Sequence, residues 1–156
     1  MIIYTHNECL KKFNGHTHPE RKERLESILS SIKSSNLKVE FKEAPLADLE
    51  TVSLVHPKQH IEQIFSNIPK EGLAGVEKEP YADTMLCPYS QNAILRSCGA
   101  GIAAAKDLMV KNERVFCAVR PPGHHAETIR ANGFCFINNV AVAASCLLYT
   151  SPSPRD

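Results

Sequence analysis

The sequence predicts an α/β domain built around a mainly parallel sheet. Segments with apolar residues at helical spacing are interspersed with short apolar segments that suit strands. One of these, RVFCAV at residues 114–119, is apolar on both faces, which is typical of a central parallel strand covered on both sides. The loop that follows, RPPGHHAE at residues 120–127, places two adjacent histidines beyond the carboxyl end of that strand, where open α/β sheets gather their ligands.

The N-terminal part of the sequence predicts a strand, a helix and a second strand. MIIYT at residues 1–5 suits a short first strand. Residues 19–33 predict a helix, because apolar residues recur every three or four positions and charges occupy the other face. Thr17 and Glu20 fit a capping box at its start. KVEFKEA, residues 38–44, alternates apolar and charged residues like a half-buried strand.

The rest of the sequence predicts three more helices and one long loop. The helical pattern returns at residues 56–68 and again at residues 90–113. Residues 69–89, rich in glycine and proline, predict a loop long enough to be functional. The final apolar segment, VAVAASCLLY, follows two asparagines, either of which can cap a helix.

Composition excludes several classes of protein. A chain of 156 residues suits one domain, and its net charge of +1 gives no electrostatic case for binding nucleic acid or an anionic membrane. No apolar run approaches the ~20 residues that span a bilayer, and the N-terminus is too short and polar for a secretory signal. The six cysteines form no C-x-x-C pair, so we expect reduced thiols in a cytosolic protein.

The histidine pair, His124 and His125, has the chemistry of an acid–base site. Imidazole exchanges a proton near neutral pH, so one histidine can act as base while the other acts as an electrostatic partner or acid. Pro121 and Pro122 stiffen the approach, and Gly123 allows a sharp turn or a close contact. Two histidines in a loop are, however, often only polar surface.

Metal and thiol sites have weaker support. His56 and His60 have the i, i+4 spacing of a helical zinc site but lack a third ligand, and HTH at residues 16–18 fits a polar loop. A hydrolase that pairs the histidines with a cysteine is a third possibility. Cys135 is the nearest thiol in sequence, although its phenylalanine neighbours favour a buried structural role.

Three strings together resemble the histone deacetylase family, in the form shared by its class II enzymes and bacterial relatives. RPPGHHAE followed by GFCFINNVAVAA is the specific match. HPERKERL resembles the family's HPERPERL, and DTMLCPYS resembles its acidic loop. The resemblance runs from the first residues to about Leu148. It implies an arginase-like α/β fold and a zinc-dependent deacetylase that acts on acetylated lysine or, in some relatives, acetylated polyamines.

The resemblance also assigns roles to individual residues. His125 matches the general base that later protonates the leaving amine, and His124 matches its partner. Gly133 and Phe134 match the wall of the tunnel that grips the acyl-lysine stem. Asp83 matches the rim carboxylate that binds substrate backbone amides, although a solvated turn aspartate is the alternative.

Arg24 matches a buried arginine behind the site, with an exposed helix arginine as an equal alternative. Two departures from the family pattern affect only local backbone: Tyr89 replaces a glycine and Lys22 replaces a proline.

The family's zinc ligands, a D-x-H motif and a later aspartate, have no match, and neither does its catalytic tyrosine. The only aspartate after the histidine pair is Asp156. We therefore expect the N-terminal part of a deacetylase-like domain at residues 1–148, an unrelated or disordered tail at residues 149–156, and no zinc bound by this chain. A native short tail is the alternative.

The sequence thus predicts a zinc-dependent deacetylase by family resemblance, with this chain an inactive fragment. A catalytically silent binding module of the same fold is the alternative. Expected partners are acetylated lysine of a protein or an acetylated polyamine, with no nucleic acid, no membrane and self-association through uncovered apolar surface. We expect a cytoplasmic location, or a nuclear one in a eukaryote.

Overall fold

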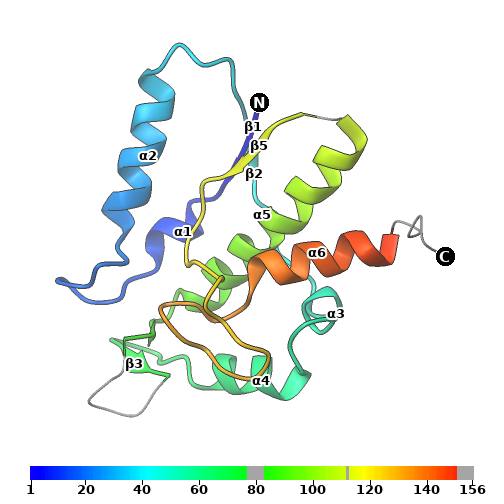
Figure 1. Ribbon diagram of the computed structural model, residues 1–156. Helices are drawn as coiled ribbons and strands as arrows, with labels where there is room; N and C mark the ends of the chain where they lie inside the picture. The colour runs from blue at the N-terminus through cyan, green and yellow to red at the C-terminus, as the bar shows by residue number, and fades with distance from the viewer. Residues whose placement is uncertain (77–82, 112, 151–156) are drawn as a thin grey trace.

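The computed structural model describes residues 1–76, 83–111 and 113–150 (Figure 1). Its main sheet has three strands in the order β2-β1-β5, and both pairings are parallel. Ile2 in the middle strand lies opposite Glu40 on one side and Val115 on the other. The strands are β1 (Ile2–Thr5), β2 (Glu40–Glu43) and β5 (Val115–Cys117).

Helices cover both faces of this sheet, with α2 on one side and α5 on the other (Figure 1). Because successive side chains of a strand point to opposite faces, Ile3 packs with Leu25 of α2 while Ile2 packs with Ala100 of α5. The covering helices are α1 (Glu8–Lys11), α2 (Lys22–Ser34) and α5 (Ser90–Lys111).

The largest apolar core lies on the other side of α5. It joins this helix to α4, α6 and the loop before α6, where Phe136 and Ile137 are buried. β3 and β4 form a small antiparallel pair nearby. The remaining elements are α3 (Leu49–Val52), α4 (Lys58–Ser66), α6 (Asn139–Thr150), β3 (Ala74–Gly75) and β4 (Met85–Leu86).

The structure confirms the predicted fold class, because helices flank a parallel sheet on both sides. Strands lie within residues 1–5 and 38–44, and helices lie within residues 56–68 and 90–113, as predicted. The parallel strand within residues 114–119 is also present, but it lies at an edge of the described sheet. β1 is the central strand, since it alone pairs on both sides there.

Other local predictions needed correction. The segment expected to be one long loop contains β3 and β4, and its residues 77–82 lie outside the described part, as do residues 151–156 of the expected tail.

The predicted capping box is wrong: α2 begins at Lys22, and its extended N-cap residue Arg21 makes no side-chain cap. Glu20 is instead buried against Arg120, which satisfies its carboxylate away from the helix end. Asn138 does cap α6, accepting from the Ala141 N–H at 3.0 Å.

All six cysteines are free thiols, and five of them are buried. None of the described helices is long and apolar enough to cross a membrane.

Candidate active site

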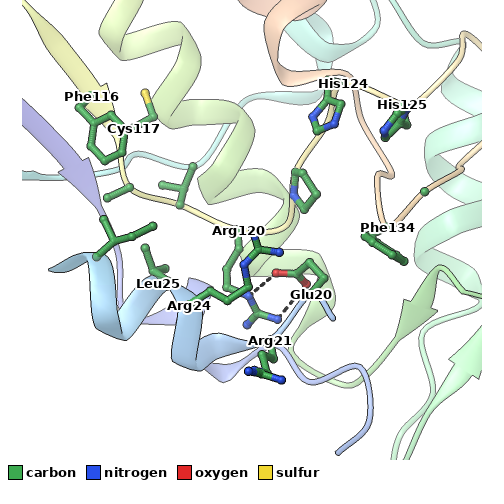
Figure 2. Close-up of a pocket in the computed structure, with 15 residues that line it drawn as sticks. Glu20, Arg21, Arg24, Leu25, Phe116, Cys117, Arg120, His124, His125 and Phe134 are labelled. Carbon is green, nitrogen blue, oxygen red and sulfur yellow. Dashed lines mark hydrogen bonds and ion pairs between the residues drawn. The ribbon is translucent and has the colours of Figure 1, made fainter. Parts of the chain in front are cut away.

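A pocket of about 530 Å³ lies between α2, β5 and the histidine loop, which we define as residues 120–138. Figure 2 shows the two imidazoles and the Phe134 ring on one side of it, with Phe116 of β5 toward the opposite end. His124, His125, Gly133 and Phe134 all line this pocket. The structure thus brings four of the five predicted site residues to one cavity.

The histidine loop leaves β5 and is held from behind by two helices. Ser97 of α5 donates to the carbonyl oxygen of Pro121 at 2.7 Å, and Asn139 at the start of α6 donates to the Ser97 hydroxyl at 2.8 Å. Gly123 is required for this approach, because a Cβ atom there would lie 2.4 Å from the carbonyl oxygen of Ile137. The loop is therefore pressed against the helix layer, and its histidines face outward.

The imidazoles of His124 and His125 form a close pair. Their ring centroids are 4.3 Å apart and the ring planes are tilted by 51°. Both residues are exposed, and neither side chain hydrogen-bonds to another residue in the described part of the chain. Their ring nitrogens are therefore available to a ligand in the pocket, which is what proton transfer requires.

A buried ion pair lies at the floor of the pocket (Figure 2). Arg120 contacts both carboxylate oxygens of Glu20, at 2.6 and 2.9 Å, and its remaining nitrogen donates to the carbonyl oxygens of Cys9 and Lys12. Burial alone would raise the pKa of the Glu20 carboxyl. The hydrogen bonds and charge of Arg120, with the charge of Lys12, instead hold that pKa below its ordinary value.

Lys12 extends this buried cluster toward β4. Its ammonium group donates to the side-chain oxygen of Asn14 and to the carbonyl oxygen of Met85 at 3.1 Å, and it lies 5.1 Å from the centre of the Phe136 ring. Burial lowers the pKa of Lys12 to about 8, although the charge of Glu20 opposes the change. The lysine therefore links β4, which lies within the acidic loop at residues 83–90, to the pocket floor.

Gly133 and Phe134 form a tight turn beside His125. Both have positive φ angles, 54° and 69°. A Cβ atom on Gly133 would lie 3.0 Å from Cδ2 of His125, so the missing side chain leaves room for the imidazole. The backbone N–H of Phe134 donates to the Thr84 hydroxyl at 3.1 Å. This bond fixes the aromatic wall, formed by Gly133 and Phe134, next to the acidic loop at residues 83–90.

Asp83, the fifth predicted site residue, lies beside this wall. The Thr84 hydroxyl donates to Oδ1 of Asp83 at 2.9 Å, and His18 Nε2 lies 2.9 Å from the carbonyl oxygen of Asp83. Asp83 is exposed. Its carboxylate is therefore connected to Phe134 through a single hydroxyl group.

His56 and His60 bind the histidine loop rather than lie in the pocket. His56 is fully buried, its Nδ1 donates to the carbonyl oxygen of Thr128 at 3.0 Å, and its Nε2 accepts from the Asn138 N–H at 2.9 Å. Burial lowers the pKa of His56, which favours its neutral form. His60 stacks on His56 and contacts the carbonyl oxygen of Phe136. This is a structural role.

The other candidate residues take ordinary positions. Cys135 is fully buried and its thiol lies 3.3 Å from the carbonyl oxygen of Gly133, while burial raises its pKa. It is therefore a poor nucleophile, which weakens the cysteine hydrolase hypothesis. Arg24 is exposed on α2, although it lines the pocket, and the buried arginine of the site is Arg120.

Sequence reasoning missed four residues of the site, of which Arg120 is one. His18 was assigned to a polar loop, Thr84 was not singled out, and Lys12 gave no signal as a lone lysine in a polar segment. His18 and Thr84 each lie inside a string that carried the family resemblance, HPERKERL and DTMLCPYS, so those strings were the available signal.

Beyond the end of a parallel strand the structure places paired histidines, an aromatic wall and a nearby carboxylate, an arrangement suited to acid–base chemistry on a bound ligand. The histone deacetylase domain matches residues 18–153, and the chain belongs to this family.

Individual relatives agree with the family match. A probable deacetylase of Archaeoglobus fulgidus is 31% identical over 94% of this chain, and histone deacetylase 9 of Homo sapiens is 32% identical over 86% of it. The crystal structure of the HDA15 HD domain superposes with a TM-score of 0.86 at 25% identity and covers 96% of this chain.

The relatives are much longer than this chain. The chain covers 40% of the archaeal deacetylase, 15% of histone deacetylase 9 and 44% of the HDA15 HD domain.

Proposed function

We propose that this chain supplies the proton-transfer and substrate-binding part of a deacetylase that hydrolyses acetylated amines. The observation that carries the proposal is the pair of exposed imidazoles, without hydrogen-bond partners among the described residues, beside the wall formed by Gly133 and Phe134. Family membership supports the same reaction class.

The chain's own residues account for the movement of protons. We assign His125 as the base that takes a proton from the attacking water as its oxygen bonds to the acyl carbon. The same proton passes to the nitrogen when the carbon–nitrogen bond breaks, which gives a carboxylic acid and a free amine. His124, with its ring 4.3 Å away, orients the water and adjusts the charge near His125.

The substrate that fits best is an acetylated lysine side chain in a peptide. The Phe134 ring suits a slender methylene stem, because it buries apolar area and excludes water. Asp83 is exposed beside that ring, so its carboxylate can accept hydrogen bonds from substrate backbone amides. Acetylated polyamines share the stem and the acetyl group but offer no peptide backbone, and they form the second substrate class.

The zinc ion that the family resemblance implies does not fit the residues described. No group of three or more histidine, cysteine, aspartate or glutamate side chains within residues 1–76, 83–111 and 113–150 is placed to hold a metal ion. The relatives extend well beyond the matched region. We therefore propose that a zinc cage in the whole protein uses residues outside the described part of this chain.

The direct test is acetate release from an acetyl-lysine peptide and from an acetylated polyamine by the whole protein that carries this sequence. Faster hydrolysis of the peptide supports the assignment. Binding of the peptide without acetate release, at any zinc concentration, would favour the silent binding module instead.

A further inference from the structure

His18 contacts three parts of the site that are far apart in the sequence. Its ring nitrogens reach the backbone of Glu20 and Asp83, and its ring packs edge-on against Phe134 with centroids 4.7 Å apart and planes at 74°. Glu20 is the buried partner of Arg120 at the start of the histidine loop. His18 therefore lies where the pocket floor, the acidic segment and the aromatic wall meet.

The hydrogen bonds fix which nitrogen of His18 carries a proton. The carbonyl oxygen of Asp83 can only accept, and it lies 2.9 Å from Nε2, so Nε2 is the donor. Nδ1 accepts from the Glu20 N–H at 3.0 Å in the neutral ring. In the charged ring Nδ1 can donate to the carbonyl oxygen of Glu20, which is 3.2 Å away. The bond to Asp83 persists in both states.

These contacts close a ring of four residues. His18 bonds to the backbone of Asp83, Asp83 accepts from Thr84, Thr84 accepts from the Phe134 N–H, and the Phe134 ring returns to His18. Each member is held from two sides. This closed set of four contacts thus sets the separation between the Asp83 carboxylate and the aromatic wall.

We propose that His18 is a positioning residue that aligns the Asp83 carboxylate with the Phe134 wall, so that the site favours acetylated lysine within a peptide over a free acetylated amine. This rests on the proposed deacetylase function. His18 does not touch the reacting atoms. It acts by holding Asp83 where the backbone amides on either side of the acetyl-lysine meet it.

Two substitutions at His18 separate its contact with Asp83 from its contact with Phe134, and a third, at His16, is the control. His18→Phe keeps an aromatic edge against Phe134 but loses the donor to Asp83. His18→Gln retains a donor near the position of Nε2 and loses the ring. His16→Phe is the matched control, because His16 is exposed in the same loop and its ring packs edge-on against Phe13, at 5.1 Å, instead of against the site.

The kinetic test uses the whole protein. In His18→Phe we expect KM for an acetyl-lysine peptide to rise about 3- to 10-fold, the range for one lost hydrogen bond, with kcat within about 2-fold. KM for a small acetylated amine should stay unchanged, and His18→Gln should recover most of the loss. Unchanged peptide KM in an active His18→Phe enzyme, or equal effects on both substrates, would overturn the proposal.

A second measurement does not depend on activity. In NMR spectra of the chain with labelled histidine, His18 should carry its proton on Nε2, and the amide signals of Thr84 and Phe134 should shift in His18→Phe but not in His16→Phe. A proton on Nδ1 alone, or unmoved signals, would refute the positioning role. If no amide is hydrolysed, the proposed function fails while this measurement still decides whether His18 positions the two residues.

Discussion

Arg120 and Glu20, one hundred positions apart in the chain, form a buried ion pair with two contacts, at 2.6 and 2.9 Å. The pair joins the first residue of the histidine loop to the segment that precedes α2. Because both side chains are almost fully buried, each charge depends on the other for compensation. The position of the pocket floor therefore depends on this pair.

Glu20→Gln should strongly destabilise the fold. It leaves the Arg120 charge buried without its partner, and breaking such a pair costs about 3–5 kcal/mol. The measurement is the free energy of unfolding in urea. Glu26→Gln is the control, because Glu26 pairs with Lys22 on the exposed surface of α2, and such pairs contribute less than about 1 kcal/mol. Equal effects of the two substitutions would contradict a buried pair.

The same pair makes the fold sensitive to acid. The folded-state pKa of Glu20 lies below its ordinary value, so its contribution is complete above the ordinary pKa of glutamate. That contribution is lost as pH falls through the folded-state pKa. The Glu20→Gln variant should therefore show a shallower loss of stability in acid than the wild type.

Lys12 should also make stability rise with pH, but in the alkaline range. Its pKa falls from 10.5 to about 8 on folding, so the unfolded chain binds more protons between these values and stability rises with pH across this window. Between pH 7.5 and 9.5 the free energy of unfolding should increase by up to about 2 kcal/mol on account of Lys12. We expect Lys12→Met to lose this increment in urea titrations. The exposed neighbour gives the control, Lys11→Met, which should retain it.

Gly133→Ala should disturb His125 directly. The new Cβ would lie 3.0 Å from the imidazole, and the positive φ angle adds backbone strain of about 1–2 kcal/mol. Gly72→Ala isolates the strain, because Gly72 has a φ of 70° and, its chain neighbours aside, no described residue would lie within 4 Å of a Cβ atom there. Both variants should lose stability, but only Gly133→Ala should slow acetate release. Equal activity of the two would show that His125 tolerates displacement.

Zinc binding tests the proposal that a zinc cage uses residues outside the described part of this chain. After mild chelation and re-addition, the chain of 156 residues should hold well below one zinc ion per molecule by elemental analysis. The reason is that the described residues offer no group of three ligands. One tightly held zinc per chain would show that other residues of the sequence complete a cage.

The elements were predictable wherever a local pattern decides the structure. The apolar periodicity within residues 90–113 defines α5, because that pattern reflects burial of part of the helix surface. The apolar run before the histidines predicts a strand at β5, but not its burial, since Phe116 is exposed there. The central position of β1 was not predictable, since strand order depends on pairing between distant segments. Glu20 was assigned to a helix cap for the same reason: its partner, Arg120, is remote in sequence.

The candidate site was predictable as a set of residues but not as a structure. The strings around His125 and Asp83 carried the family resemblance and named the groups. The link between them passes through the His18 ring and the Thr84 hydroxyl, which are ordinary loop residues until the fold brings them together. Contacts of this kind leave no periodic signal in the sequence.

The most direct test of the central claim is the turnover of an acetyl-lysine peptide by the whole protein carrying His125→Ala, compared with His16→Ala. His16 is an exposed loop histidine outside the histidine loop, so its loss should leave kcat unchanged. We predict that His125→Ala lowers kcat by about 10²- to 10⁴-fold, because proton transfer to the leaving amine is lost. Full activity of His125→Ala would contradict the account and leave the histidine pair as loop residues.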